Sequence, residues 1–249
     1  LIRGCQSTII PNNVKEIGSS AFSSCLGLSS ISIPEGVKII GMNAFFGCQK
    51  LTSIEIPNSV ISFGDRAFFK CLALTSIVIP QSVTKIGDEA FHICSNLTLI
   101  TIPKSVTSIG TNAFSGCSSL TSIIVDKDNK VYDSRNNCNA IIETATNILI
   151  HGCQCTIIPD GITGIGPHAF SDCVDLTSIR IPESVRNIGP WAFSRCSNLT
   201  SIVFPKSMTN IGIGAISGCK SLKSITLPKS IKLEDIAIPN QTIIYRHQN

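Results

Sequence analysis

The chain has 249 residues, of which 43% are hydrophobic and only 14% charged, with a formal net charge of +4. This length leaves ample material for a continuous core. The charge does not fit a nucleic-acid binder, because no arginine-rich run with interleaved aromatic residues occurs. The sequence also contains no signal peptide and no apolar run of about 18 residues that could span a membrane.

A period of 23 residues runs along almost the whole chain. A fixed period in the range of about 20–50 residues indicates one supersecondary unit stacked on copies of itself. Three residue types mark the period: prolines at Pro11, Pro34, Pro57, Pro80, Pro103, Pro159, Pro182, Pro205 and Pro228; phenylalanines at Phe22, Phe45, Phe68, Phe91, Phe114, Phe170 and Phe193; and cysteines at Cys25, Cys48, Cys71, Cys94, Cys117, Cys173, Cys196 and Cys219.

Each unit begins its repeat with a strand. The segment 51–56, Leu-Thr-Ser-Ile-Glu-Ile, alternates apolar and polar residues, which is typical of a short strand. We expect Ile54 and Ile56 to point inward and Ser53 and Glu55 to point to solvent. The proline that follows cannot donate to a ladder and ends the strand.

The rest of the unit reads Ser-Val-Thr-x-Ile-Gly-x-x-Ala-Phe-x-x-Cys, nearly unchanged in 105–126 and 184–206. The Val and Ile positions predict a brief extended segment that ends in a turn, which glycine permits. The Ala-Phe-x-x-Cys piece is too short for a helix, so a single 3₁₀ or α turn is predicted. Stacking of about ten such coils would bury the apolar residues and align the phenylalanines in one core column, with Ile216 replacing the ring in the last regular unit.

The period breaks once, between Pro103 and Pro159. In this stretch Ile141–Ile142 and 148–150 flank 143–147, which is a hairpin pattern. We therefore predict a single domain, 1–249. Within it we expect regular coils over 1–125, an enlarged coil with a β-hairpin over 126–158, regular coils over 159–230 and a C-terminal cap over 231–249 that ends in the strand 242–245.

Residues 149–159 resemble residues 1–11, so the chain is expected to start inside a second enlarged coil and to be a piece of a longer array. From Leu176 onward nine Lys or Arg residues stand against three acidic ones. A weak contact with a polyanion and a solvated basic end both fit this surplus.

The in-register cysteines are interpreted as small buried hydrophobic residues, because stacked parallel side chains suit a disulfide poorly. Cys5, Cys138, Cys153 and Cys155 lie off register. With His151 nearby, the last three could hold a metal, although Cys-x-Cys spacing is a weak zinc signal. Cys138 could instead form a disulfide with Cys153 or Cys155, and free thiols remain the third alternative.

The sequence offers no catalytic or cofactor-binding motif. His92, His151, His168 and His247 are scattered, and no Gly-x-Ser-x-Gly, His-Glu-x-x-His or phosphate-binding loop occurs. We therefore predict no enzyme activity, no catalytic residue, no metal site and no cofactor. What the stack offers instead is a regular grid of outward-facing strand positions, rich in hydroxyls. From this grid the candidate binding residues are Ser53, Glu55, Ser76, Val78, Leu99, Thr101, Ile124, Ser178 and Arg180.

The unit 105–123, Ser-Val-Thr-Ser-Ile-Gly-Thr-Asn-Ala-Phe-Ser-Gly-Cys-Ser-Ser-Leu-Thr-Ser-Ile, resembles the BspA-like leucine-rich repeat family, and the resemblance covers 7–126 and 156–230. The stretch 131–134 is similar to a recurrent interruption in that family. The resemblance implies a leucine-rich repeat solenoid. It also implies a surface or secreted protein of anaerobic gut or oral bacteria, or of mucosal protozoan parasites, that adheres to host proteins or other microbes.

Three functions follow as hypotheses. The first is an extracellular or cell-surface adhesion module that presents its sheet face to a protein or glycan on a host or microbial surface. The second is a structural spacer without a ligand of its own. The third and most remote is a carbohydrate-active or metal-dependent enzyme. We expect a monomer that does not bind nucleic acid.

Overall fold

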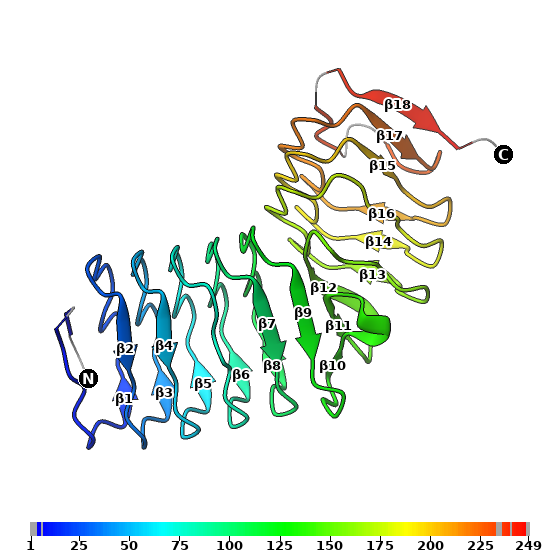
Figure 1. Ribbon diagram of the computed structural model, residues 1–249. Helices are drawn as coiled ribbons and strands as arrows, with labels where there is room; N and C mark the ends of the chain where they lie inside the picture. The colour runs from blue at the N-terminus through cyan, green and yellow to red at the C-terminus, as the bar shows by residue number, and fades with distance from the viewer. Residues whose placement is uncertain (1–3, 6, 233–235, 240, 248–249) are drawn as a thin grey trace. The chain divides into compact units, whose positions relative to one another are not determined.

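The structure, a computed structural model, describes residues 4–5, 7–232, 236–239 and 241–247. It confirms the predicted fold class, a mainly β solenoid of about ten coils spaced by about 23 residues (Figure 1). Among the described residues, η1 (Arg135–Asn137) is the one helix, and it is a short 3₁₀ helix. The coils form two compact units, Leu1–Val131 and Tyr132–Asn249, which are described separately below.

The coils of the first unit contribute strands to parallel sheets on two sides. On one side β2 (Ser30–Ser32) pairs with β4 (Ser53–Glu55), and β7 (Leu99–Ile102) pairs with β9 (Ser122–Val125). On the other side, in spatial order, lie β1 (Glu16–Ile17), β3 (Ile39–Ile40), β5 (Ser62–Phe63), β6 (Lys85–Ile86) and β8 (Ser108–Ile109). These two-residue strands are the brief extended segments predicted before each glycine, and they form a sheet of their own.

Sequence alternation sets which strand residues face the core. In β2 and β4 the central isoleucines Ile31 and Ile54 are 9% exposed, while both flanking residues of each strand are exposed. Pairing runs in steps of 23 residues, so that Ile31 lies opposite Ile54. Like residues therefore lie above like residues, and each isoleucine is buried by its equivalents in the neighbouring coils.

The Ala-Phe-x-x-Cys segment differs from the predicted 3₁₀ or α turn. It is a run of tight turns in which two residues per coil have positive φ, for example Arg66 (55°) and Lys70 (58°), whereas helical turns need negative φ. In this conformation the backbone N–H groups of the segment donate to carbonyls of the next coil; for example, the Phe68 N–H donates to the Ala90 carbonyl at 2.7 Å. The turn side of the solenoid thus has its own ladder of hydrogen bonds between coils.

The phenylalanines of the period form the predicted core column. In the first unit five rings, from Phe22 to Phe114, stack with centroid distances of 5.1–5.4 Å and interplanar angles of 3–7°. In the second unit Phe170 and Phe193 stack at 5.1 Å, and Ile216 is fully buried in the following coil. A stack of parallel rings is the direct result of placing the same residue at the same point of each coil.

Six in-register cysteines donate to the carbonyl of the phenylalanine 26 residues earlier, and Cys25 and Cys173 donate to the carbonyls of Gly4 and Gly152. The Cys48, Cys71 and Cys94 thiols donate to Phe22, Phe45 and Phe68 at 3.0, 3.2 and 3.1 Å. All in-register cysteines are free thiols, and all but the half-buried Cys25 are buried, so the interpretation as small buried residues is confirmed. Burial also raises the pKa of the Cys48 thiol to about 12, so it stays protonated and can donate.

The second unit begins with the predicted hairpin. Strands β11 (Ala140–Glu143) and β12 (Ile148–Gly152) pair antiparallel around the turn at 144–147. The sheet that contains them has the order β10 (Tyr132–Asp133), β11, β12, β13 (Gly164–Ile165), β14 (Asn187–Ile188) and β16 (Asn210–Ile211). A second sheet joins β15 (Ser201–Val203), β17 (Ser224–Leu227) and β18 (Ile243–Arg246). The hairpin connects to the regular coils because β12 pairs parallel with β13.

The two sequence stretches that resemble each other also share a local structure. The amide N–H groups of Gly4 and Gly152 donate to alanine carbonyls at 2.7 and 2.8 Å, and those of Cys5 and Cys153 donate to threonine hydroxyls at 2.7 and 2.8 Å. The predicted cap, 231–249, lies partly outside the described residues, as do residues 1–3; the strand expected at 242–245 corresponds to β18. The predicted single-domain boundaries stay a prediction.

Candidate functional site

The predicted binding residues of the first unit lie on one exposed strand face. We name as the strand face the outward positions of β2, β4, β7, β9 and the coil segment 76–78 between them. Its predicted members are all exposed: Ser53, Glu55, Ser76, Val78, Leu99, Thr101 and Ile124. Register places Leu99 opposite Ser122 and Thr101 opposite Ile124. Neighbouring strands in a sheet lie about 4.8 Å apart, so the structure brings these side chains into one continuous surface.

Three apolar side chains stand out on this face. Val78 is 80% exposed, Leu99 is 41% exposed and Ile124 is 47% exposed. The alternate positions of the same strands, such as Ile100 and Ile123, are buried at 0% and 2%. The core of the first unit therefore does not use Val78, Leu99 or Ile124, and burial of these side chains by another molecule would be favourable.

Polar groups surround this apolar centre. The Ser32 hydroxyl donates to Oε2 of Glu55 at 3.1 Å, one coil away. Threonine hydroxyls also bridge coils, as Thr98 Oγ1 donates to the Thr75 carbonyl at 3.3 Å and Thr121 Oγ1 to the Thr98 carbonyl at 3.3 Å. These bonds hold the rim residues in fixed positions, so the face is rigid and largely neutral.

The last two predicted residues, Ser178 and Arg180, belong to the second unit. Both are exposed. The backbone of Arg180 forms a parallel β-bridge with Val203 of the neighbouring coil. Its guanidinium Nη1 lies 3.3 Å from Oδ1 of Asp160, and the side chains of Arg180 and Asp160 are 74% and 81% exposed. An ion pair this exposed contributes little to stability, so Arg180 remains available to a ligand.

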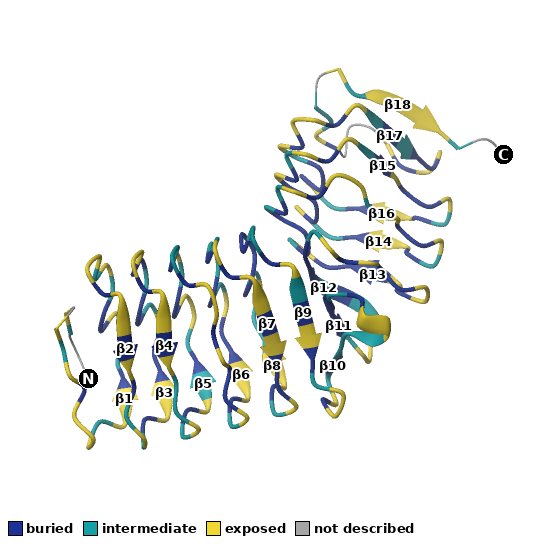
Figure 2. Cartoon of the chain, viewed as in Figure 1, coloured by how far each residue is buried: buried dark blue, intermediate teal, exposed yellow. Residues whose placement is uncertain are grey.

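Two further exposed residues lie in the same column as Arg180 and were not among the predicted binding residues. Val203 is 53% exposed, and Tyr245 in β18 is 52% exposed and lies opposite Thr226. The 23-residue step does identify Val203 as the equivalent of Arg180. It does not identify Tyr245, because β18 pairs with β17 at a step of 19 residues and leaves the period. Figure 2 shows β18 exposed along its whole length.

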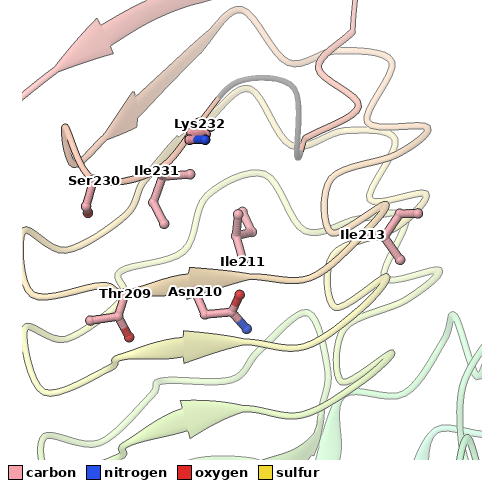
Figure 3. A pocket seen from close by; sticks show the side chains of 7 residues that line it. All are labelled: Thr209, Asn210, Ile211, Ile213, Ser230, Ile231 and Lys232. Atoms are coloured by element: carbon pink, nitrogen blue, oxygen red, sulfur yellow. The ribbon is translucent and has the colours of Figure 1, made fainter.

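A shallow pocket of about 450 Å³ lies at the edge of β16 (Figure 3). Thr209, Asn210 and Ile211 form one side of it, and Ser230, Ile231 and Lys232 the other. Among the described residues that line it, Lys232 is the one ionisable group, and hydroxyls, an amide and isoleucines complete the lining. This set contains no nucleophile paired with a base, so the pocket has the chemistry of a surface hollow rather than of an active site.

The off-register cysteines and His151 do not form a metal centre in the described part of the chain. No group of three or more His, Cys, Asp or Glu side chains that could hold a metal is found there. Cys138 and Cys153 are buried free thiols, and Cys5 and Cys155 are exposed free thiols. His151 is 8% exposed, and burial lowers its pKa to about 4, so it is neutral at physiological pH.

The comparisons with known proteins agree with the repeat seen in the structure. The family model described as BspA type leucine-rich repeat region matches residues 15–142 and 151–244, in six copies. The chain belongs to this family. Leucine-rich repeat proteins of this type are typically not enzymes.

Solved structures of bacterial proteins show the same fold. A leucine-rich repeat protein from Eubacterium ventriosum is 28% identical, with a TM-score of 0.74 over 86% of this chain and 60% of that one. A leucine-rich cell surface protein from Faecalibacterium prausnitzii is 28% identical, with a TM-score of 0.54 over 95% of this chain and 84% of that one. The pneumococcal vaccine antigen PcpA is 21% identical with a TM-score of 0.62, over 94% of this chain and 80% of that one, which shows the fold alone.

This BspA-type chain therefore spans 60% of the length of the Eubacterium protein that it matches. The comparison with curated proteins gives no match. Among the described residues there is no helix that is long and apolar enough to cross a bilayer.

Proposed function

We propose that this BspA-type repeat chain is an extracellular or cell-surface interaction module that binds a protein of a host or microbial surface through its strand face. The observation that carries the proposal is the set of three exposed apolar side chains, Val78, Leu99 and Ile124, within a rim of hydroxyls. Protein interfaces have this composition, with an apolar centre and a polar, solvent-accessible rim. The similarity to the leucine-rich cell surface protein from Faecalibacterium prausnitzii supports the location.

The rigidity of the face also favours binding. Its strands are fixed by ladders on both sides of the coil, and its threonine side chains by bonds to the previous coil. A partner that docks there would order few side chains, which reduces the entropic cost of association. Arg180 of the second unit is a further candidate contact, since Arg is enriched in interfaces.

A triple substitution of the apolar centre tests the proposal. Val78→Ser, Leu99→Ser and Ile124→Ser together change exposed side chains, so we expect the coil fold to persist by circular dichroism. Binding to an array of host extracellular-matrix proteins and bacterial surface proteins should fall about 10-fold or more, since central apolar contacts dominate interfaces. The matched control is Ile39→Ser with Ile61→Ser, which changes exposed isoleucines at the other sheet of the first unit, in β3 and just before β5, and should leave binding unchanged.

The structural-spacer hypothesis gives a different result in the same experiment. A spacer would bind no protein of the array above background, and the triple variant would behave as the parent chain. Binding that is retained in the triple variant would place the contact elsewhere and refute the strand face as the site.

A further inference from the structure

A groove on the turn side of the second unit is separate from the strand face. It has a volume of about 520 Å³, within the range of about 300–1,000 Å³ typical of small-ligand sites. Its lining comes from three successive coils: His168 and Ser171, then Trp191, Ser194 and Arg195, then Ser217. The groove thus runs along the stack, between one column of residues that contains His168 and Trp191 and another that contains Arg195.

The first unit shows what fills the equivalent place. There the residue after each core phenylalanine is itself a ring in three coils. Phe46 and Phe69 stack at 4.9 Å with an interplanar angle of 2°, and Phe69 lies 5.1 Å from His92. In the second unit the same register holds Ser171, Ser194 and Ser217. The groove is therefore a position where this fold accepts rings, stacked about one coil apart, and where small side chains leave the place open.

Trp191 is an unusual choice for its position. The residue at this point of the coil has positive φ, which glycine and asparagine tolerate best. Asn43, Asn112 and Gly214 occupy it in three coils, and four other coils have Ser20, Arg66, Glu89 and His168 there, all smaller than tryptophan. Trp191 adopts φ 51° and its side chain remains 42% exposed. A bulky residue is strained in this conformation, and the core gains little from a ring that is so exposed. Such a local conflict without structural gain is expected at functional sites.

The neighbours of Trp191 hold its ring in place. The His168 ring stacks on it at 5.1 Å with an interplanar angle of 21°. In the next coil Gly214 has no side chain, and a Cβ there would lie 2.5 Å from the indole Cδ1 and Nε1 atoms. A side chain at 214 would clash with the ring as it is placed, so the stack of side chains that starts at His168 ends at Trp191.

The groove also contains buried polar groups. Ser171 is 3% exposed, and its hydroxyl donates to Oδ2 of Asp172 at 3.2 Å. Arg195 donates from Nη2 to the same oxygen at 2.7 Å, so the two charges compensate each other. Ser194 is 8% exposed, and it lines the groove. A ligand that covers the Ser194 hydroxyl must supply a hydrogen bond to it, because a hydroxyl buried without a partner is unfavourable.

We propose that this groove binds a neutral saccharide, with one pyranose ring packed against the exposed part of the indole of Trp191. A pyranose has an apolar face of C–H groups that packs on an aromatic ring, and an edge of hydroxyls that donate and accept hydrogen bonds. Ser194 Oγ, Ser171 Oγ and the Arg195–Asp172 pair lie where such hydroxyls need partners. An aromatic side chain of a peptide would stack equally well but would leave the Ser194 hydroxyl unpaired, and an acidic sugar would find Arg195 already neutralised. The inference does not rest on the strand face, which shares none of these residues.

The intrinsic fluorescence of the chain gives a direct test, because Trp191 is its single tryptophan. The chain is titrated with neutral oligosaccharides of glucose, galactose, mannose, fucose, N-acetylglucosamine and N-acetylgalactosamine, and with sialylated and uronate-containing oligosaccharides. We expect a saturable change in the emission of Trp191 with at least one neutral sugar, matched by heat in calorimetry.

Two variants then locate the bound sugar, with calorimetry as the readout. Trp191→Ala removes the stacking ring, and Ser194→Phe places in the groove the ring that Phe69 supplies in the first unit. Each variant should keep the far-ultraviolet circular dichroism spectrum and weaken the sugar about 10-fold or more. Val203→Ser, an exposed change on a strand of the same unit, is the matched control and should bind as the parent chain does.

Three results would overturn the proposal. The first is a panel in which no neutral sugar changes the emission or gives heat. The second is binding confined to the acidic sugars, and the third is undiminished affinity in both groove variants.

Discussion

Two separate variants, one at a core phenylalanine and one at the surface phenylalanine next to it, distinguish the stability that comes from core packing from the stability that comes from ring stacking alone. Phe68 is fully buried in the core column and contacts three rings: Phe45 at 5.4 Å, Phe91 at 5.1 Å and, edge to face, Phe63 at 5.6 Å. The next residue, Phe69, is half-buried and contacts two rings on the surface. The two substitutions Phe68→Ala and Phe69→Ala thus remove the same side chain from adjacent positions of one turn.

Their expected costs differ because burial differs. Truncating a buried phenylalanine lowers the free energy of unfolding by about 3–5 kcal/mol. Phe68 should fall near the upper end, about 4–5 kcal/mol, because a cavity at its place would interrupt a ring column in which each aromatic contact adds about 0.5–1.5 kcal/mol. Phe69 leaves no closed cavity. It loses two ring contacts and a weak cation–π contact with Lys70, 5.5 Å from its centroid, so about 1–2 kcal/mol is expected.

Equilibrium urea denaturation followed by far-ultraviolet circular dichroism measures both costs. Trp191 fluorescence in the same samples follows the second unit by itself, because the first unit contains no tryptophan. The circular dichroism transition of Phe68→Ala should shift to much lower urea than that of Phe69→Ala. Equal shifts for the two variants would refute the argument that a closed column of rings holds the coils together.

Three further predictions concern single side chains. Burial lowers the pKa of His151 to about 4, so between about pH 6.5 and pH 4 the unfolded chain binds a proton that the folded chain does not. The free energy of unfolding should therefore be highest above about pH 6.5 and fall by about 3 kcal/mol by pH 4. The variant His151→Gln should lack this part of the pH dependence in urea titrations. Gly110→Ala should destabilise by about 3 kcal/mol, since its Cβ would lie 2.4 Å from backbone of the preceding coil. In Gly161→Ala the new Cβ meets no atom within 4 Å and the only strain is a φ of +89°, so the free energy of unfolding should fall by about 1 kcal/mol in thermal melts. A larger loss for Gly161→Ala than for Gly110→Ala would be inconsistent with the close approach of the coils at Gly110. Hydrogen bonds from neighbouring hydroxyls lower the pKa of Cys5 to about 7, so its alkylation, followed by mass spectrometry, should reach half its maximal rate near pH 7 rather than near pH 9.

Much of the fold can be predicted from the sequence because particular residue types recur at the same position of every 23-residue repeat. Proline, phenylalanine and cysteine at a step of 23 place the strand, the ring column and the thiol in each coil. The hairpin of 140–152 follows from two apolar runs around a polar turn. The turn conformation does not follow, because residues such as Arg66, Ile93 and Trp191 have positive φ without any local signal for it. Hydrogen bonds to the next coil impose that conformation, and they are invisible in a single repeat.

One candidate site, the strand face, could be predicted from the sequence, whereas the groove beside Trp191 could not. Alternation in β4, β7 and β9 predicts which side chains face outward, so Glu55, Leu99 and Ile124 are found from sequence and are exposed as expected. The groove beside Trp191 was not predicted, although a signal exists. Aligning the coils shows serine at 171 and 194 where the first unit has Phe46 and Phe69. In the sequence alone this difference looks like ordinary variation at a surface position. Only the structure shows that aromatic rings stack at this position in the first unit.

The bonds between coils are as repetitive as the residues. The Phe22, Phe45 and Phe68 amides each donate to an alanine of the following coil, and all three distances are 2.7 Å. Loss or gain of one 23-residue segment would therefore join two surfaces that already match, without a new interface being required. Unequal recombination within such a gene can change the length of the array in single steps, so selection can adjust how far the chain reaches independently of the side chains displayed on it.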